Sequence, residues 1–209
     1  MAKAIFDVDI LIYEAKALQW AQQFNAVCYL QSNAYADMYT SIPSLLAVDA
    51  RYAFKASENN TFEGLEKFKA KHPDQWMFGF FSYDLKNEIE QLETPFPNRL
   101  GFPAAYFFIP RYILCFHDDK MEIEAENPQD IFNAIDQTIS NTNTKQVTKV
   151  NLQNRLSKAA YFEAFAKMMH HIHRGDIYEV NLCQEFFAEQ AEINPLTVYQ
   201  RLNKVSPTP

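Results

Sequence analysis

Glycine is scarce in this sequence, which contains only 4 glycines in 209 residues. Glycine reaches left-handed backbone conformations without the strain that other residues pay there. Because there are so few, we expect each one to mark a position where the backbone needs such a conformation or a close approach. Gly79 and Gly175 are the two whose neighbours indicate a specific role.

Long apolar runs and paired cysteines are also missing. No stretch approaches the roughly 20 apolar residues that span a bilayer, and acidic residues stand near the start where a secretory signal would have its apolar core. We therefore expect a cytoplasmic protein without a membrane segment. Cys28, Cys115 and Cys183 are odd in number and widely spaced, which favours reduced, packed thiols over a disulfide framework or a zinc site.

Basic residues are fewer than acidic ones. The sequence has 19 Lys and Arg and 26 Asp and Glu, which gives a formal net charge of -7. A nucleic-acid surface needs clustered Lys and Arg to neutralise phosphates, so we expect no nucleic-acid partner. An acidic average still allows one local basic pocket for an acidic small molecule. With 48% hydrophobic and 22% charged residues, the composition is typical of a globular protein with one large core or two smaller ones.

Apolar periodicity predicts helices over residues 10–24, 61–72, 128–140, 158–174 and 195–205, and strands over 26–32, 45–54, 76–85, 104–126 and 177–187. Gly79 interrupts the third strand, where we expect it to let two backbones pack closely. The acids Glu122, Glu124 and Glu126 share one face, which we expect to be solvated and to protect a sheet edge. The pattern changes at Val147, where we place a domain boundary between 1–146 and 147–209.

The helix over 158–174 is the best-defined element. Ser157 is available as its cap, and Gly175 stands just past its last turn, where a left-handed residue ends a helix. Its predicted core-facing stripe falls at i, i+4, i+7 and i+11 and consists of Tyr161, Phe165, Met168 and Ile172.

The strand predicted after Gly175 has one polar side, which carries Glu179 and Asn181. In one interpretation this side faces a cavity, and in the other the strand is half-exposed with a solvated face. The helix that follows is predicted to start at Asn194 and Pro195, with Leu196, Tyr199 and Leu202 inward.

Residue chemistry alone indicates no catalytic or metal site. His170 and His173 lie at i, i+3, but a metal site needs a third ligand, and histidines in a last turn also suit the negative end of the helix dipole. Around Ser82 there is no GxSxG turn, and the sequence contains no GxxxxGK phosphate loop.

Several segments taken together resemble a known family. YFEAFAKMMHHIHRGDIYEVNLCQEFF (161–187) resembles the opening of the chorismate-binding domain shared by anthranilate synthase and aminodeoxychorismate synthase component I, where a helix ends in a GDxYQVNL strand. LNKVSPTP (202–209) is similar to the family's NPSP stretch, with Ser206 in place of Asn. FGFFSYDL (78–85) is similar to its GxxGYDL element. YLQSN (29–33) and YADMYTS (35–41) resemble its effector-pocket strand and loop.

This resemblance implies an α+β fold of mostly antiparallel sheets with flanking helices, as an incomplete half of the sandwich of anthranilate synthase component I. Residues 1–146 would form the N-terminal component I domain and 147–209 the truncated start of the chorismate-binding domain. The family's catalytic residues, its Mg2+ ligands and the nucleophilic lysine of aminodeoxychorismate synthases lie beyond the NPSP stretch. We therefore assign no catalytic and no metal-binding residue to this chain, although Mg2+ is implied for the complete enzyme.

Two substitutions depart from the family pattern. Glu179 replaces a Gln, and Gln31 with Ser32 stands where anthranilate synthases have the Glu and Ser of an LLES motif that binds feedback tryptophan. Loss of that carboxylate removes a charge-assisted partner for the ligand's ammonium group, so we do not expect tight tryptophan inhibition. The resemblance assigns a pocket for a tryptophan-like effector to Gln31, Ser32, Tyr39, Asn181 and Pro209.

Three functions remain open at this point. The first is the N-terminal part of an aminodeoxychorismate synthase component I, which converts chorismate and ammonia to 4-amino-4-deoxychorismate with a glutamine amidotransferase partner. The second is anthranilate synthase component I of the tryptophan pathway. The third is a non-catalytic module that binds an amino acid or docks a partner subunit. For such a fragment we also expect exposed apolar surface near Ile177.

Overall fold

The computed structural model describes residues 1–33, 35, 38, 42, 44–56, 60–90, 92, 97–139 and 150–208. It divides into two compact units, unit 1 (Met1–Thr142 and Tyr199–Pro209) and unit 2 (Asn143–Val198). Helix α6 (Pro195–Val205) crosses this division, so its part from Tyr199 onward belongs to unit 1. Our predicted boundary after residue 146 falls in 140–149, outside the described residues.

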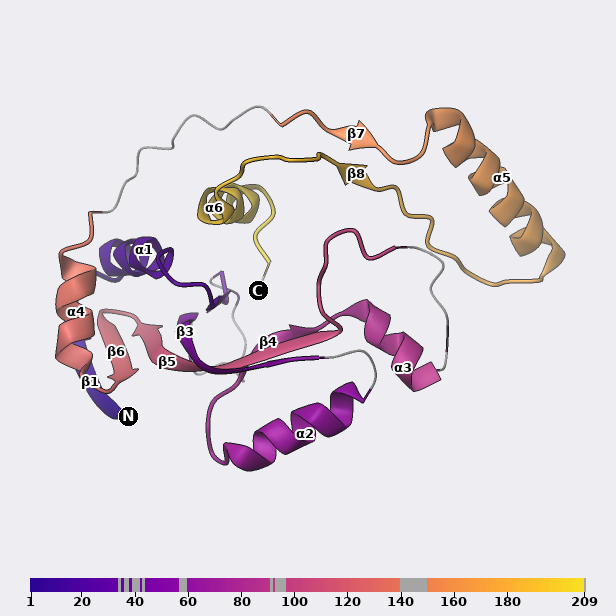
Figure 1. Ribbon diagram of the computed structural model, residues 1–209. Helices are drawn as coiled ribbons and strands as arrows, with labels where there is room; N and C mark the ends of the chain where they lie inside the picture. The colour runs from indigo at the N-terminus through magenta and orange to yellow at the C-terminus, as the bar shows by residue number, and fades with distance from the viewer. Residues whose placement is uncertain are drawn as a thin grey trace. The chain divides into compact units, whose positions relative to one another are not determined.

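Unit 1 is built on a 6-stranded sheet (Figure 1). Five strands have the order β1-β6-β5-β3-β2, and the sixth, β4, pairs with β5. Every pairing in it is antiparallel, which agrees with the predicted α+β fold. The strands are β1 (Ala2–Asp7), β2 (Val27–Gln31), β3 (Ser44–Lys55), β4 (Phe78–Phe81), β5 (Ala105–His117) and β6 (Lys120–Ala125).

Strand β5 organises the sheet because it is 13 residues long and apolar along most of its length. Strand β3 runs along one of its edges, while β4 pairs with its first half and β6 with its second half on the other edge. The pairing of β3 with β5 shifts register between Ala50 and Tyr52, next to Asp49, whose φ is +62°. The resulting bulge bends a strand that would otherwise be straight over 12 residues.

Helices α1 (Ile10–Ala21) and α4 (Pro128–Asp136) cover one face of the sheet (Figure 1). The Asp9 side chain caps α1 by accepting a hydrogen bond from the backbone N–H of Ile12 at 3.4 Å. The core under these helices joins α1, α4, β3, β5 and β6 and contains Ala17, Trp20, Ala21, Leu46, Val48, Leu114, Phe116, Met121, Ile123, Ala125 and Ile135. A second, smaller core lies around Ala47, Phe78 and Phe108.

Strand β1 is one element that the sequence reasoning missed. It pairs with β6 from Ala2 opposite Ala125 to Asp7 opposite Lys120, so β6 is an inner strand and our assignment of its acids to an edge was wrong. Lys3 Nζ lies 2.9 Å from Glu122 Oε1 and 3.7 Å from Glu124 Oε2. The acidic face therefore has a basic partner from the neighbouring strand, in addition to solvent.

The predicted strand over 76–85 is shorter than expected, because β4 ends at Phe81 and passes into a 3-10 turn (η1, Tyr83–Leu85) and α3 (Lys86–Glu90). The helix that precedes β4 in the chain is α2 (Thr61–Lys71), which agrees with the helix predicted over 61–72. The role of Gly79 is confirmed: a Cβ at this position would collide with the backbone carbonyl oxygen of Tyr106 and lie 2.7 Å from Phe107 Cα.

Unit 2 contains β7 (Gln153–Asn154), α5 (Lys158–Arg174), β8 (Phe186–Phe187) and the first turn of α6. Both predicted ends of α5 are confirmed. Ser157 Oγ accepts from the N–H of Ala160 at 3.2 Å, and Gly175 has φ +78° with its N–H donated to the Ile172 carbonyl.

Three predictions about this region were wrong. The apolar stripe of α5 is not buried, since no residue of the helix is, and Phe165 is 48% exposed. Of the predicted strand over 177–187, only Phe186 and Phe187 form a strand. Among the described residues, the strand that pairs with this segment is β7, which is two residues long. Cys183 is exposed rather than packed.

On α6, within unit 1, Leu202 is also 60% exposed instead of inward, and Asn203 is the half-buried neighbour. Exposed side chains in unit 2 include Ile177, Tyr178 and Val180, as expected for a segment without a strand partner. In the described part of the chain, no helix combines the length and apolar character needed to cross a bilayer.

Candidate functional site

A cavity of unit 1 lies at the end of β2 and has a volume of about 480 Å³. This is within the range of small-molecule pockets, roughly 300–1,000 Å³. One wall comes from β2 and the turn after it, another from Ile42 and β3, and the third from α6 and the segment after it. The lining residues are Tyr29, Leu30, Gln31, Ser32, Asn33, Ile42, Leu45, Tyr199, Asn203 and Thr208.

The two tyrosines of the cavity are held by packing and hydrogen bonds. The ring of Tyr29 meets that of Tyr199 edge to face, with centroids 5.7 Å apart. Tyr29 Oη donates to Glu14 Oε1 at 2.6 Å, and the same oxygen accepts from Ser44 Oγ at 2.5 Å. Burial, followed by the bond to Glu14, raises the pKa of Tyr29 above its ordinary value, so this phenol remains a neutral donor.

A network of side-chain amides joins β2 to α6. Gln31 Oε1 accepts from Tyr199 Oη at 3.2 Å and from Asn203 Nδ2 at 3.3 Å. Asn33 and Asn203 form a reciprocal amide pair at 2.8 and 2.9 Å, and Asn33 Nδ2 also donates to the carbonyl of Thr208 at 2.6 Å. Because Tyr199 and Asn203 are four residues apart, they lie on the same face of α6 and reach β2 together.

Of the predicted effector residues, Gln31 and Ser32 come together in this cavity. Asn181 belongs to unit 2, where it is exposed. Tyr39 and Pro209 lie outside the described residues. Sequence reasoning missed Tyr29, Asn33 and Asn203 as lining residues, although the i, i+4 spacing of Tyr199 and Asn203 is the signal that could have found the last of them.

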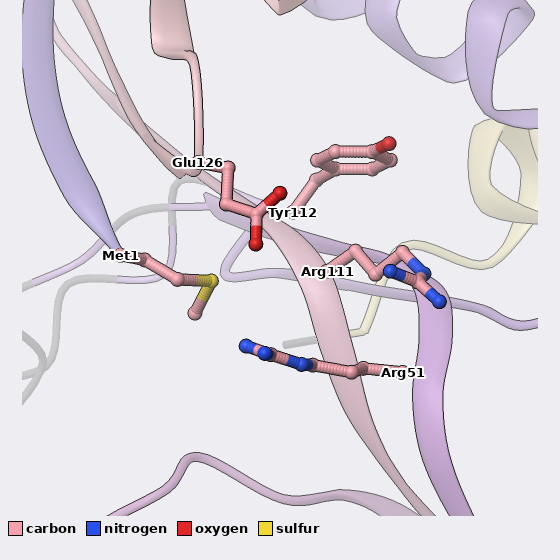
Figure 2. A pocket seen from close by; sticks show the side chains of 5 residues that line it. All are labelled: Met1, Arg51, Arg111, Tyr112 and Glu126. Carbon is pink, nitrogen blue, oxygen red and sulfur yellow. The ribbon is translucent and has the colours of Figure 1, made fainter.

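A second cavity of about 40 Å³ lies where Met1, β3, β5 and the end of β6 meet (Figure 2). The guanidinium groups of Arg51 and Arg111 extend in different directions in Figure 2, and Arg111 Nε pairs with Asp49 Oδ2 at 3.2 Å. Its other lining residues are Met1, Tyr112 and Glu126. With room for little more than a water and no converging donors, it does not form a ligand site.

The described residues contain no group of three or more His, Cys, Asp or Glu side chains arranged to hold a metal ion. In the last turn of α5, His171 Nδ1 instead contacts Asp176 Oδ2 at 2.7 Å, and Arg174 Nε lies 3.5 Å from the same oxygen. The residues present therefore do not fit the Mg2+ that the resemblance implies, and none of them is assigned to it.

Unit 1 is thus an antiparallel α+β unit with an aromatic-walled pocket beside its edge strand β2, and the described lining of that pocket is uncharged. Residues 13–209 match the family of chorismate binding enzymes, and the chain belongs to that family.

Curated relatives carry names from one branch of this family. An anthranilate synthase component I-like protein of a Synechocystis species is 26% identical over 140 residues, which cover 64% of this chain and 29% of the relative. Anthranilate synthase component 1 of Thermus thermophilus is 24% identical over 180 residues, or 78% of this chain and 38% of the relative. The chain thus spans about a third of the length of these relatives.

The fold agrees with a solved structure. Anthranilate synthase component I from Streptococcus pneumoniae superposes with a TM-score of 0.61 and 16% sequence identity, over 83% of this chain and 48% of that chain. At this identity the likeness concerns the fold alone, and it confirms the α+β architecture expected from the sequence.

Proposed function

We propose that this chain is the effector-binding portion of a component I synthase that aminates chorismate to 4-amino-4-deoxychorismate, on the route to para-aminobenzoate and folate. Family membership supports chorismate as the substrate class. The observation that carries the choice of product is Gln31 in the cavity wall, because an amide replaces the carboxylate with which an anthranilate synthase would hold tryptophan.

A second candidate is anthranilate synthase component I. The names of the relatives from Synechocystis and Thermus favour it. In this case the cavity would still be the effector site, with altered ligand preference. Both candidates share the substrate and differ in the ring position that receives the amine.

Within either enzyme, the proposed role of this chain is binding rather than chemistry. Gln31 and Ser32 offer polar contacts to an effector, while the rings of Tyr29 and Tyr199 enclose its apolar part. Ammonia would come from a glutamine amidotransferase subunit. In the complete enzyme, Mg2+ would neutralise the carboxylates of chorismate and would be held by residues outside the described part of this chain.

The test is to express the complete reading frame that encodes this chain and supply chorismate, glutamine, Mg2+ and an amidotransferase subunit. We expect 4-amino-4-deoxychorismate, detected as 4-aminobenzoate after addition of a lyase. Fluorescent anthranilate would establish the second candidate instead. If neither product forms and calorimetry shows binding of the amidotransferase subunit, both enzyme candidates are wrong and the chain is a non-catalytic docking module.

A further inference from the structure

We propose that the 480 Å³ cavity selects a small aromatic carboxylic acid that lacks an α-ammonium group, and that Gln31 sets this preference. The inference rests on the proposed effector role of the cavity and adds the chemical class of its ligand. The side-chain amides of Gln31, Asn33 and Asn203 form hydrogen bonds that can run in only one direction.

The carbonyl oxygen of Thr208 determines that direction, because a backbone carbonyl can only accept. Asn33 must therefore turn its Nδ2 group toward Thr208, and the second hydrogen of that group reaches Asn203 Oδ1 at 2.8 Å. This leaves Asn203 Nδ2 facing Asn33 Oδ1 at 2.9 Å and Gln31 at 3.3 Å. The Gln31 atom that meets Asn203 Nδ2 must consequently be the acceptor Oε1.

Both acceptor positions of Gln31 Oε1 are then occupied, one by Asn203 and one by Tyr199 Oη at 3.2 Å. The Nε2 group of Gln31, with two donors, has no partner among the described residues, and neither has the Ser32 hydroxyl. Both side chains line the cavity. The Gln31 Nε2 group can only donate and the Ser32 hydroxyl can donate as well as accept, so the lining offers donors that suit the oxygens of a carboxylate.

An ammonium group finds no charged partner in the described lining. All ten described lining residues are uncharged, and the nearby carboxylate of Glu14 already accepts from Tyr29 and Ser44. An ammonium group placed there would lose its hydration without a compensating carboxylate, which is costly. The apolar part of the wall, formed by Tyr29, Tyr199, Leu30, Ile42 and Leu45, fits an aromatic ring.

The experiment is isothermal titration of the 209-residue chain with indole-3-propionate and with L-tryptophan. These probes share a ring, a chain length and a carboxylate, and differ only in the α-ammonium group. We expect indole-3-propionate to bind at least about tenfold more tightly, the factor that corresponds to one charge-assisted hydrogen bond.

Gln31→Glu should reverse the order. A carboxylate keeps one oxygen for Tyr199 and Asn203 and turns the other, an acceptor, to the cavity, so tryptophan should gain and indole-3-propionate should lose about tenfold. Gln200→Glu is the matched control, because it adds the same charge on α6 at an exposed position outside the cavity lining. We expect it to leave both affinities unchanged.

The outcomes separate this inference from the proposed function. Equal or tighter binding of tryptophan by the unmodified chain overturns the ligand class while leaving the effector pocket in place. If neither probe binds, both the ligand class and the effector pocket fail. A shift in Gln200→Glu as large as in Gln31→Glu would show a general charge effect and remove Gln31 as the residue that sets the preference.

Discussion

Unit 1 and unit 2 form their helices by the same local rules but bury them very differently. In unit 1, α1 starts at a capping Asp9 and packs Ala17, Trp20 and Ala21 into a core shared with three strands. In unit 2, α5 has a better cap at Ser157 and a glycine stop at Gly175, yet none of its residues is buried. Capping and periodicity thus define where a helix starts and ends, and do not ensure that its apolar face has a partner.

The strands of the two units differ even more clearly than their helices. Strands β3 and β5 pair from Ser44 opposite Phe116 to Lys55 opposite Tyr106, with one register shift, and contribute side chains to the core of unit 1. The segment 177–187 alternates as clearly in its sequence, but only its last two residues pair, with β7. A helix closes its hydrogen bonds within itself, whereas a strand depends on a neighbour.

The largest expected effect contrasts the same truncation in the two units. Phe116→Ala removes a side chain that is 1% exposed and should lower the free energy of unfolding by about 3–5 kcal/mol. Phe165→Ala on α5 removes one that is 48% exposed and should cost less than about 1 kcal/mol. Urea unfolding followed by circular dichroism measures both. Equal losses of unfolding free energy in the two variants would contradict the difference in burial between the two units.

Gly79→Ala should come next, with a loss of about 1–3 kcal/mol, because the added Cβ must displace the backbone of β5 at Tyr106. Gly64→Ala is the control in α2, where the new Cβ meets only the Phe54 ring, at 2.9 Å, and alanine favours the helix. The midpoint of urea unfolding should fall for Gly79→Ala and change little for Gly64→Ala. A tolerated Gly79→Ala would mean that β4 can move away from β5.

Gly175→Ala tests unit 2 by itself. Nothing lies within 4 Å of the added Cβ, so the effect comes from φ +78° alone, about 1–2 kcal/mol. It should fray the last turn of α5, where the N–H of Asp176 donates to the carbonyl of His171 at 3.0 Å. Faster amide exchange at Asp176 measures this, and Gly175→Asn should restore part of the protection. Unchanged exchange in Gly175→Ala would contradict the helix-stop role.

The smallest effect concerns acid stability in unit 1. Tyr13 Oη and Lys16 Nζ bind Asp136 Oδ1 at 2.7 and 3.1 Å, and these bonds, the one from Tyr13 first, lower the pKa of Asp136. A lowered folded-state pKa means that the bonds stabilise the fold above the unfolded value, near pH 3.9, and that this contribution disappears as the pH falls through the folded-state pKa.

Asp136→Asn should therefore flatten the loss of stability between about pH 5 and pH 2.5. The change should be small, because solvent screens this exposed pair. Urea midpoints measured across that range give the slope. Asp130→Asn, an exposed acid on the same helix, is the control and should keep the slope of the unmodified chain. A steeper slope in Asp136→Asn would contradict the assignment.

The candidate site was predictable in part. Gln31 and Ser32 could be named because the resemblance places them on the strand and loop of an effector pocket, and they do line one cavity. Asn33 and Asn203 could not be paired in advance, since they are 170 residues apart and nothing local to either indicates the other. Asn181 remains a prediction for this pocket, as do Tyr39 and Pro209 beyond the described residues.

The sequence by itself determined the elements whose cause is local: the helix stop at Gly175, the cap at Ser157, and the requirement for glycine at Gly79. Only the tertiary structure decided which strands have neighbours. It paired β1 with β6, left most of 177–187 unpaired, and oriented the Gln31 amide from the Thr208 carbonyl. The reason is physical: these bonds join groups far apart in the chain, so their partners and directions exist only once the chain has folded.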